Sequence, residues 1–400
     1  MMFNEIELSS VITDIAAGPF GSNLKVSCFV PHGFPIIDGA NLKGFKVTDN
    51  LTKFVTEDKA RSLGRSIARR GDVVVTISGT LGQIAYIPND SMFEEYLCSQ
   101  RQFRVSFDAT RVYVPYLVFY FHTNEGQSKI LAFANQTGVP ALSQPLKNFK
   151  KIRIHLPSYD EQRRIASVIE SINDKIDCNQ KINDNLYEMV NAYYTSLFRE
   201  NDCEMTTVGN YAERIYSGGT PMTSNAAYWN GTFGWFSSGE TRNRFVISTE
   251  KTITQAGIDN SSTKLAIKYD IVMASAGQGF TRGQTSMLLI DTYVNQSVIV
   301  IKSERNILPY LFWNLANRYD ELRAISDSSS IRGSLTTKMI AAFEIPLANE
   351  QSLQAFADFA WSVIPQIENN LLENERLTAL RDSLLPKLMS GEIDVSDIQL

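Results

Sequence analysis

Hydrophobic residues in much of this chain occur in runs of four or five, and each run is broken by glycine, serine or polar residues. Short apolar runs bounded by turn residues are typical of buried strands. Short helical stretches, such as Tyr116–His122 and Tyr310–Asn317, lie between them. The pattern predicts a mixed α+β fold with polar, glycine-rich loops. The clearest predicted strands are Val73–Ile77, Phe103–Phe107, Ile271–Ala274 and Val298–Ile301.

A different pattern, with a period of seven residues, runs from Glu161 to Phe198. It predicts one helix of roughly 57 Å, at about 1.5 Å per residue, with an apolar seam interrupted at Lys175. Asn179 is polar at a seam position, a substitution that fixes the register of a coiled coil at some cost in stability. The predicted seam residues of this helix are Ile165, Val168, Ile172, Asn179, Ile182, Leu186 and Met189.

A second long helix is predicted near the C-terminus, with Asn370 and Asn374 at polar seam positions. Pro365 predicts a kink, because an interior proline removes a backbone hydrogen bond and costs about 3 kcal/mol. Each long helix could pack on its own globular segment, or the two could pair as an antiparallel coiled-coil spacer. Their length and acidity favour the spacer. The seam residues predicted here are Phe356, Val363, Ile367, Leu377 and Leu384.

The two halves of the chain repeat one another. GDVVVTISGTLGQ from Gly71 returns as YDIVMASAGQGF from Tyr269, and YLCSQRQFRVSF from Tyr96 returns as TYVNQSVIVIKS from Thr292. Repeats of this length are too long for a solenoid, whose units have about 20–50 residues. We therefore predict a duplicated module suited to a target in two parts. The predicted domains are 1–157 and 204–346, each followed by a spacer helix, at 158–203 and 347–400.

The charge of the chain is unevenly distributed. The formal net charge is −5, but residues 1–157 carry +4 and 204–346 carry +1, whereas the two helical segments carry −4 and −6. The globular segments are thus compatible with contacts to phosphates. The four cysteines have neither a zinc-binding nor a disulfide spacing, no apolar run is long enough to cross a membrane, and no secretory signal is visible, so we expect a cytoplasmic protein.

Motifs for catalysis are missing from the sequence. It contains no Walker A pattern, no adenine-methyltransferase motif and no acidic nuclease constellation, and its glycine spacing fails the dinucleotide fingerprint. His32, His122 and His155 lie near no cysteine or carboxylate at a metal-ligand spacing. We therefore expect neither a catalytic centre nor a bound cofactor or metal in this chain.

The combination of motifs resembles the specificity (S) subunit of type I restriction–modification systems, the HsdS family. The matching segments span almost the whole chain, in the family's order of recognition domain, helix, recognition domain and helix. The second helix opening departs from the first, because Gln351 is followed by SLQAFA and not by RRIASV. The matching segments are GPFGSNLK, GDVVVTISGTLGQ, LPSYDEQRRIASVIESINDKI, SGGTPMTSNAAYW, IPLANEQ and LRDSLLPKLMSGEIDV.

The resemblance implies a non-catalytic subunit that recognises double-stranded DNA. Each globular half would be a target-recognition domain that reads one half of a bipartite site. The long helices would pair antiparallel and carry two methyltransferase (M) subunits, which bring S-adenosylmethionine and methylate adenine. Restriction and translocation (R) subunits would join the full assembly. Two alternatives stay open: an enzyme with an unrecognised motif, and a coiled-coil scaffold that binds only proteins.

The candidate DNA contacts are polar and basic residues in predicted loops. Lysine and arginine suit phosphates, while asparagine, glutamine, arginine and serine suit base edges. The candidates in the first half are Asn41, Lys43, Lys46, Thr80, Gln83, Gln136 and Lys147. Those in the second half are Arg242, Arg244, Gln278, Arg282, Arg332 and Lys338.

Overall fold

The structure is a computed structural model that describes residues 4–135, 139–198, 204–277, 279–328 and 333–398. The chain divides into two compact units, each of which contains one globular half and parts of both long helices. Unit 1 comprises Met1–Asp174 and Leu377–Leu400, and unit 2 comprises Lys175–Arg376.

Unit 1 is built on two sheets and a short strand pair. The first sheet has the order β2-β10-β7-β8 and is antiparallel throughout. The second has the order β3-β5-β4-β9-β6, in which β4 and β9 are parallel. β1 (Asn4–Glu7) pairs with β11 (Arg153–Leu156). The remaining strands are β2 (Ile12–Ala17), β3 (Phe29–Val30), β4 (Phe34–Ile37), β5 (Phe54–Val55), β6 (Ile67–Arg69), β7 (Val73–Thr76), β8 (Ile84–Tyr86), β9 (Glu95–Cys98) and β10 (Gln102–Phe107).

Unit 2 repeats this arrangement with local changes. Its first sheet has the order β13-β21-β18-β19-β15, and its second β16-β14-β20-β17. The strand pair is β12 (Met205–Thr207) with β22 (Glu344–Pro346). The remaining strands are β13 (Ala212–Ser217), β14 (Trp229–Phe236), β15 (Phe245–Val246), β16 (Lys251–Ile253), β17 (Lys264–Ala266), β18 (Ile271–Ala274), β19 (Thr285–Leu288), β20 (Thr292–Val294) and β21 (Val298–Ser303).

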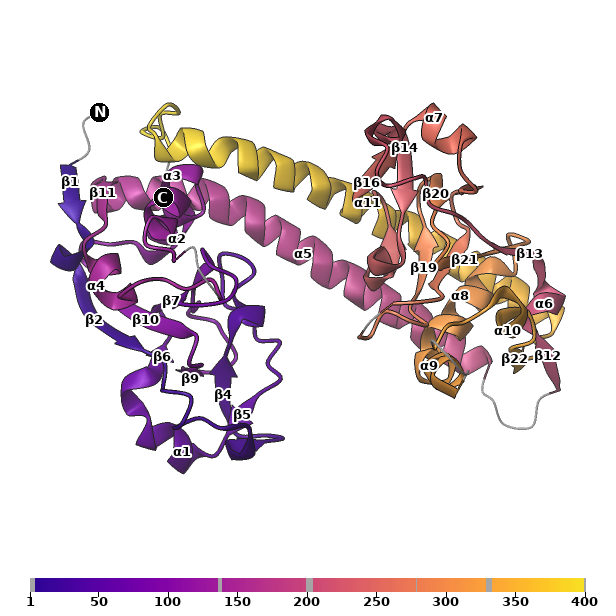
Figure 1. Cartoon of the computed structure of the whole chain (residues 1–400), viewed down its shortest axis with the longest axis horizontal. Helices are drawn as coiled ribbons and strands as arrows, with labels where there is room; N and C mark the ends of the chain where they lie inside the picture. The colour runs from indigo at the N-terminus through magenta and orange to yellow at the C-terminus, as the bar shows by residue number, and fades with distance from the viewer. Residues whose placement is uncertain (1–3, 136–138, 199–203, 278, 329–332, 399–400) are drawn as a thin grey trace. The chain divides into compact units, whose positions relative to one another are not determined.

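Short helices connect and cover these sheets (Figure 1). α2 and α8 are their most buried members, because both are almost entirely aromatic and aliphatic. In unit 1 the helices are α1 (Glu57–Ser62), α2 (Val114–Phe121), α3 (Asn124–Leu131) and α4 (Pro145–Lys150). In unit 2 they are α6 (Val208–Tyr211), α7 (Gln255–Asp259), α8 (Leu308–Asn317), α9 (Tyr319–Ser328) and α10 (Thr337–Ala341).

The repeat seen in the sequence is also a repeat of backbone hydrogen bonds. Asp72 accepts a bond from the N–H of Arg69, at 2.9 Å, just before β7. Asp270 accepts the same bond from Ile267, at 2.8 Å, just before β18. Both carboxylates are buried, and burial raises the pKa of each. The "GD" and "YD" pairs at the start of each repeat are therefore structural anchors of equivalent turns.

The two long helices are α5 (Tyr159–Leu197) and α11 (Glu350–Met389), shown in Figure 1. In unit 1, the first part of α5 and the last part of α11 share a hydrophobic core, with Ile165 and Ile169 on one helix and Leu385 and Leu388 on the other. In unit 2, the last part of α5 and the first part of α11 share the second core. The fold class predicted from the sequence is confirmed.

Buried asparagines align the helices within unit 2. Asn179 donates from Nδ2 to Oδ1 of Asn374 at 2.9 Å, and Asn370 donates to Oδ1 of Asn183 at 2.8 Å. Rising numbers on α5 thus meet falling numbers on α11, so the helices are antiparallel there. An unpaired buried amide costs about 1–3 kcal/mol, which disfavours any register that separates these pairs.

The seam predicted on α5 needs a correction. Ile182 and Met189 are 39% and 45% exposed, whereas Asn183 and Val190 are buried. Buried residues lie four positions after Ile165, Asn179 and Leu186, at Ile169, Asn183 and Val190, whereas the prediction placed the second row of the seam three positions after them. The prediction chose Ile182 and Met189 because they are apolar and fit a seven-residue period. It passed over Asn183 because a polar residue is not expected in a buried row.

The other predicted seam positions are buried or half-buried, and α11 is continuous across Pro365. The proline side chain lies on the exposed face of the helix. Helix α11 therefore does not end at this residue, and the kink expected there stays a prediction. The buried positions are Ile165, Asn179, Phe356, Val363 and Ile367, and the half-buried ones are Val168, Ile172, Leu186, Leu377 and Leu384.

Candidate nucleic-acid interface

A hollow of about 650 Å³, lined by both polar and apolar residues, lies in unit 1. Its lining includes residues of the β7–β8 loop (78–83), of the β9–β10 turn (99–101), of the segment 38–40 and of the segment 24–29. Thr80 and Gln83, two of the predicted DNA contacts, both line it. Loops held by a rigid sheet are the usual place for binding residues. The hollow is the principal candidate interface of this unit.

The β7–β8 loop is held in a defined conformation by Gln83. Its side chain accepts a hydrogen bond from Thr76 Oγ1 at 3.1 Å and donates to the carbonyl of Gly39 at 3.0 Å. Gly79 and Gly82 have φ of +97° and +86°, the left-handed region that glycine adopts without strain. Gln83 thus connects the loop to the 3₁₀ turn Gly39–Asn41, and its amide is largely used within the protein.

The β9–β10 turn carries a cation that the sequence analysis did not single out. Arg101 is exposed, and its side chain lies beside Gly79 of the β7–β8 loop: Nη1 is 3.8 Å from the point that a side-chain Cβ would occupy at that glycine. Its carbonyl accepts from Ile77 N at 2.6 Å, which fixes the backbone of the turn against β7. The signal was present in the sequence, because the repeat aligns SQRQ at Ser99 with NQSV at Asn295. The third residue of this segment is therefore charged in the first half (Arg101) and neutral in the second (Ser297).

The other candidates of the first half do not gather at this hollow. Asn41 is 4% exposed, and its amide donates to the carbonyls of Thr48 and Asn50. Lys46 lies 3.0 Å from Asp174 of α5. Lys43 and Lys147 are exposed, the latter on α4. Gln136 lies outside the described residues.

In unit 2, Arg242 and Arg244 line a second hollow, of about 480 Å³, together with residues of α5 and α11. Arg244 lies over the ring of Tyr187, with Cζ 4.1 Å from its centroid, and Arg242 forms an ion pair with Glu250. Both arginines are exposed. The structure thus brings these two candidates together beside the long helices.

The remaining candidates of the second half are dispersed. Arg282 is largely buried and forms an ion pair of 2.7 Å with Asp327 of α9, so its guanidinium is committed to the fold. Lys338 is exposed on α10. Gln278 and Arg332 lie outside the described residues.

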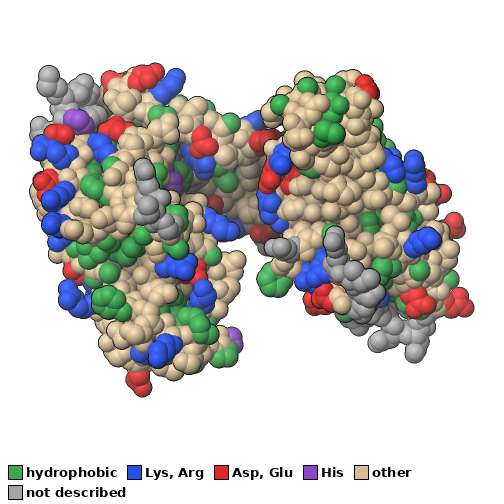
Figure 2. Space-filling view, viewed as in Figure 1, with side chains coloured by type: hydrophobic (Ala, Val, Ile, Leu, Met, Phe, Trp, Pro, Cys, Tyr) green, Lys and Arg blue, Asp and Glu red, His purple; other side chains and the backbone are tan. Residues whose placement is uncertain are grey.

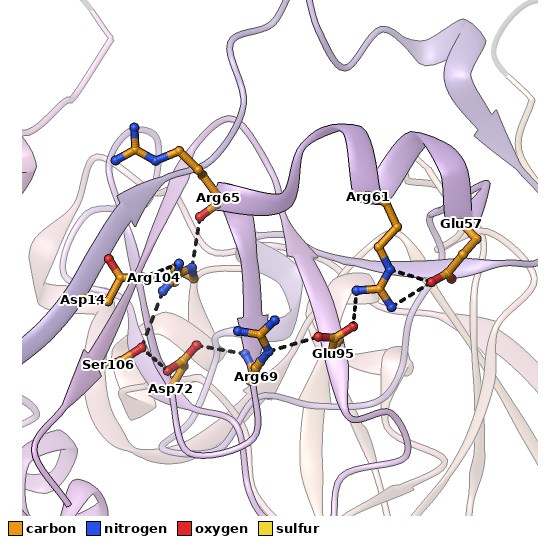
Figure 3. A network of polar contacts seen from close by, with 9 residues as sticks. All are labelled: Asp14, Glu57, Arg61, Arg65, Arg69, Asp72, Glu95, Arg104 and Ser106. Carbon is orange, nitrogen blue, oxygen red and sulfur yellow. Dashed lines mark hydrogen bonds and ion pairs between the residues drawn. The ribbon is translucent and has the colours of Figure 1, made fainter.

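A polar network joins the two sheets of unit 1 (Figure 3). Arg104 of β10 is buried and donates to Asp14 at 2.6 Å and to the carbonyl of Arg65 at 3.0 Å. The hydrogen bond from Arg104 lowers the pKa of Asp14. Burial alone would raise the pKa of Glu95, but hydrogen bonds from Arg61 and Arg69 leave it lowered. These cations are internally compensated, so they serve the fold.

Figure 2 shows how basic side chains are distributed on one face of each unit. On the displayed face of each unit in Figure 2, Lys and Arg are scattered among other residues, with Asp and Glu beside some of them.

The described part of the chain holds no group of three or more His, Cys, Asp or Glu arranged to bind a metal ion. None of its helices is long and apolar enough to cross a membrane. His122 is half-buried, its Nε2 lies 2.8 Å from the carbonyl of Ile84, and desolvation lowers its pKa.

The fold is that of a protein with two related α+β modules on one chain, each followed by a long helix, α5 or α11. The family model of the type I restriction modification DNA specificity domain matches residues 34–188 and 202–375. The chain belongs to this family of type I restriction–modification specificity subunits, which are sequence-specific DNA-recognition subunits and not catalytic ones.

Individual relatives support the same family. The chain is 26% identical over 228 residues to the EcoR124I/EcoR124II specificity subunit of Escherichia coli, a match covering 54% of this chain and 56% of the relative. It is 20% identical to the HindI specificity subunit of Haemophilus influenzae Rd over 406 residues, covering 81% and 87% of the two chains. The S subunit of the M. genitalium type I system shares the fold, with a TM-score of 0.59, 15% identity and 96% of both chains covered.

Proposed function

We propose that this chain reads a bipartite, asymmetric DNA site, with one half-site for each globular half. The observation that carries the proposal is the duplication itself. The two halves share backbone anchors such as Asp72 and Asp270, but their loops differ in length and charge. A common scaffold with different loops suits two half-sites of different sequence.

The contacts divide by chemistry. Exposed Lys43, Lys147 and Lys338 suit phosphates, which position a protein on the duplex without reading sequence. Polar residues on the hollow of unit 1, including Thr80, suit base edges in the major groove. The protein needs both kinds of contact, because phosphate contacts alone carry no sequence information.

The proposed complex contains two methyltransferase subunits that bind S-adenosylmethionine and methylate adenine, with restriction and translocation subunits in the full assembly. The paired helices α5 and α11 serve as the spacer between the readers and as a surface for these partners. Their segments are acidic, at −4 and −6, which favours partners with a complementary basic surface.

The decisive experiment maps methylated adenines in DNA from cells that express this chain with its methyltransferase subunits. A bipartite motif is expected. Replacing residues 204–346 by the corresponding segment of another specificity subunit should change one half of the motif and leave the other unchanged. A simultaneous change in both halves, or methylation without a motif, would contradict the two-reader model.

A further inference from the structure

We propose that Arg101 is a specificity-determining residue that reads a guanine in the half-site bound by unit 1. This inference rests on the proposed function and adds to it a particular residue and a particular base. Arg101 lies on the β9–β10 turn and lines the hollow of unit 1.

The guanidinium of Arg101 is available to a ligand. Its side chain is exposed, and it makes no hydrogen bond or ion pair with any residue that the structure describes. Several other arginines of unit 1 are engaged: Arg61 and Arg69 with Glu95, and Arg104 with Asp14. Arg101 therefore differs from these arginines, because none of its five side-chain donors has a partner among the described residues.

The backbone that carries this side chain is rigid. Gln102 N donates to the carbonyl of Ser99 at 3.1 Å, and the Ser99 hydroxyl donates to Gln102 Oε1. Ile77 N donates to the carbonyl of Arg101 at 2.6 Å. A fixed backbone lowers the entropy lost when a side chain is ordered on a ligand, and so suits a residue that must discriminate between similar bases.

The equivalent position in unit 2 supports a role in specificity. Ser275 N donates to the carbonyl of Ser297 at 2.8 Å, as Ile77 does to Arg101, so Ser297 occupies the same place in the repeat. The turn is kept, but the cation is replaced by a hydroxyl. The fold of the turn therefore does not require the charge, and the side chain at this position can differ between the two half-site readers.

Guanine is the base that best matches this chemistry. It presents two acceptors, O6 and N7, in the major groove, and bidentate binding by arginine is the commonest specific contact between proteins and DNA. Such a pair discriminates by about 1–3 kcal/mol, which corresponds to roughly 5- to 150-fold in affinity.

The first test compares methylation motifs from cells expressing the full complex with wild-type chain, Arg101→Ala or Arg101→Gln. Both variants should relax the motif at one guanine position, in the half-site that stays unchanged when residues 204–346 are exchanged. Arg65→Ala is the matched control. It removes the same charge from unit 1, but its side chain points away from the polar network in Figure 3 and only its carbonyl is used there. The control should keep the wild-type motif.

The second test measures binding of the purified complex to oligonucleotides that carry 7-deazaguanine in place of that guanine, which removes only the N7 acceptor. The wild-type complex should lose affinity, by less than the roughly 150-fold upper value for the whole bidentate pair, because the hydrogen bond to O6 remains. The Arg101→Ala complex should bind both oligonucleotides equally, because the donor is already absent.

Two outcomes would overturn the inference while leaving the proposed function intact. In the first, Arg101→Ala keeps the full motif. In the second, it weakens binding to all sequences equally and lowers the salt dependence, which identifies a phosphate contact. If the wild-type complex itself methylates without a bipartite motif, the proposed function has failed, and with it this inference. Circular dichroism of each variant excludes misfolding.

Discussion

The two globular halves share their strand pairing but differ in the side chains at equivalent positions of the strands. Position 104 on β10 and position 300 on β21 are equivalent, since they pair with Val74 of β7 and Val272 of β18. The first is a buried arginine within a polar network, and the second is a fully buried valine. The same strand order thus tolerates either a charged or an apolar centre. The comparison shows that duplication preserved the hydrogen-bonded frame and allowed its contents to diverge.

The largest expected effect tests whether the halves fold as separate units. Val190 of α5 is fully buried in the core of unit 2. Val190→Asp should destabilise this unit by about 3–5 kcal/mol, because an unpaired charge would be buried. Urea unfolding should show one early transition, with the core of unit 1 retained.

Met189→Asp is the matched control, because the neighbouring residue is exposed. Its effect should stay within about 0.5 kcal/mol. Equal losses from Val190→Asp and Met189→Asp in the same urea titration would mean that the stripe on α5 is wrongly assigned.

A smaller effect is expected at the position where the halves differ. Arg104→Met keeps a long apolar side chain but removes the hydrogen bonds to Asp14 and to the carbonyl of Arg65. We expect a loss of about 2 kcal/mol, within the range for hydrogen bonds to charged groups, confined to unit 1. Arg153→Met, which removes an exposed pair with Glu5, should cost less than about 1 kcal/mol. Thermal unfolding at pH 7 measures both, and a larger loss from Arg153→Met would contradict the network's role.

The smallest effect concerns the anchor that the halves share. Burial raises the pKa of Asp72, so its contribution to stability is complete below its ordinary value of 3.8 and is lost as the pH rises through the folded pKa. Asp72→Asn should remove this dependence while its amide oxygen can still accept the bond from Arg69 N. Urea titrations from pH 4 to 7 should therefore show the variant gaining stability relative to the wild type as the pH rises. A constant difference would mean that Asp72 does not titrate in this range.

Asp270→Asn provides the same measurement in unit 2. The pKa of Asp270 is also raised by burial, although Lys302 lies 3.4 Å away and opposes the shift. The equivalent residue in unit 1 is Ser106, which donates to Asp72 at 2.5 Å. The change of stability with pH should thus have the same sign in both units. A difference in its magnitude would measure the effect of the Lys302 cation on Asp270.

The sequence by itself determined the duplication, the strand runs and the two long helices. Short apolar runs and heptads are local patterns, and local patterns specify secondary structure wherever the core agrees with them. Val73–Ile77 and Ile271–Ala274, for example, became the inner strands β7 and β18. The motifs sufficed for the family, because they extend over almost the whole chain.

Only the tertiary structure decided which side chains are free to bind. Asn41 and Arg282 are polar loop residues by sequence, yet in the fold Asn41 donates to the carbonyls of Thr48 and Asn50, and Arg282 pairs with the carboxylate of Asp327. Arg101 is also a polar residue in a loop, but its side chain stays exposed. The same holds for α5, where Asn183 is buried and Met189 exposed. Burial depends on what packs opposite a residue, and that partner is supplied by segments more than a hundred residues away.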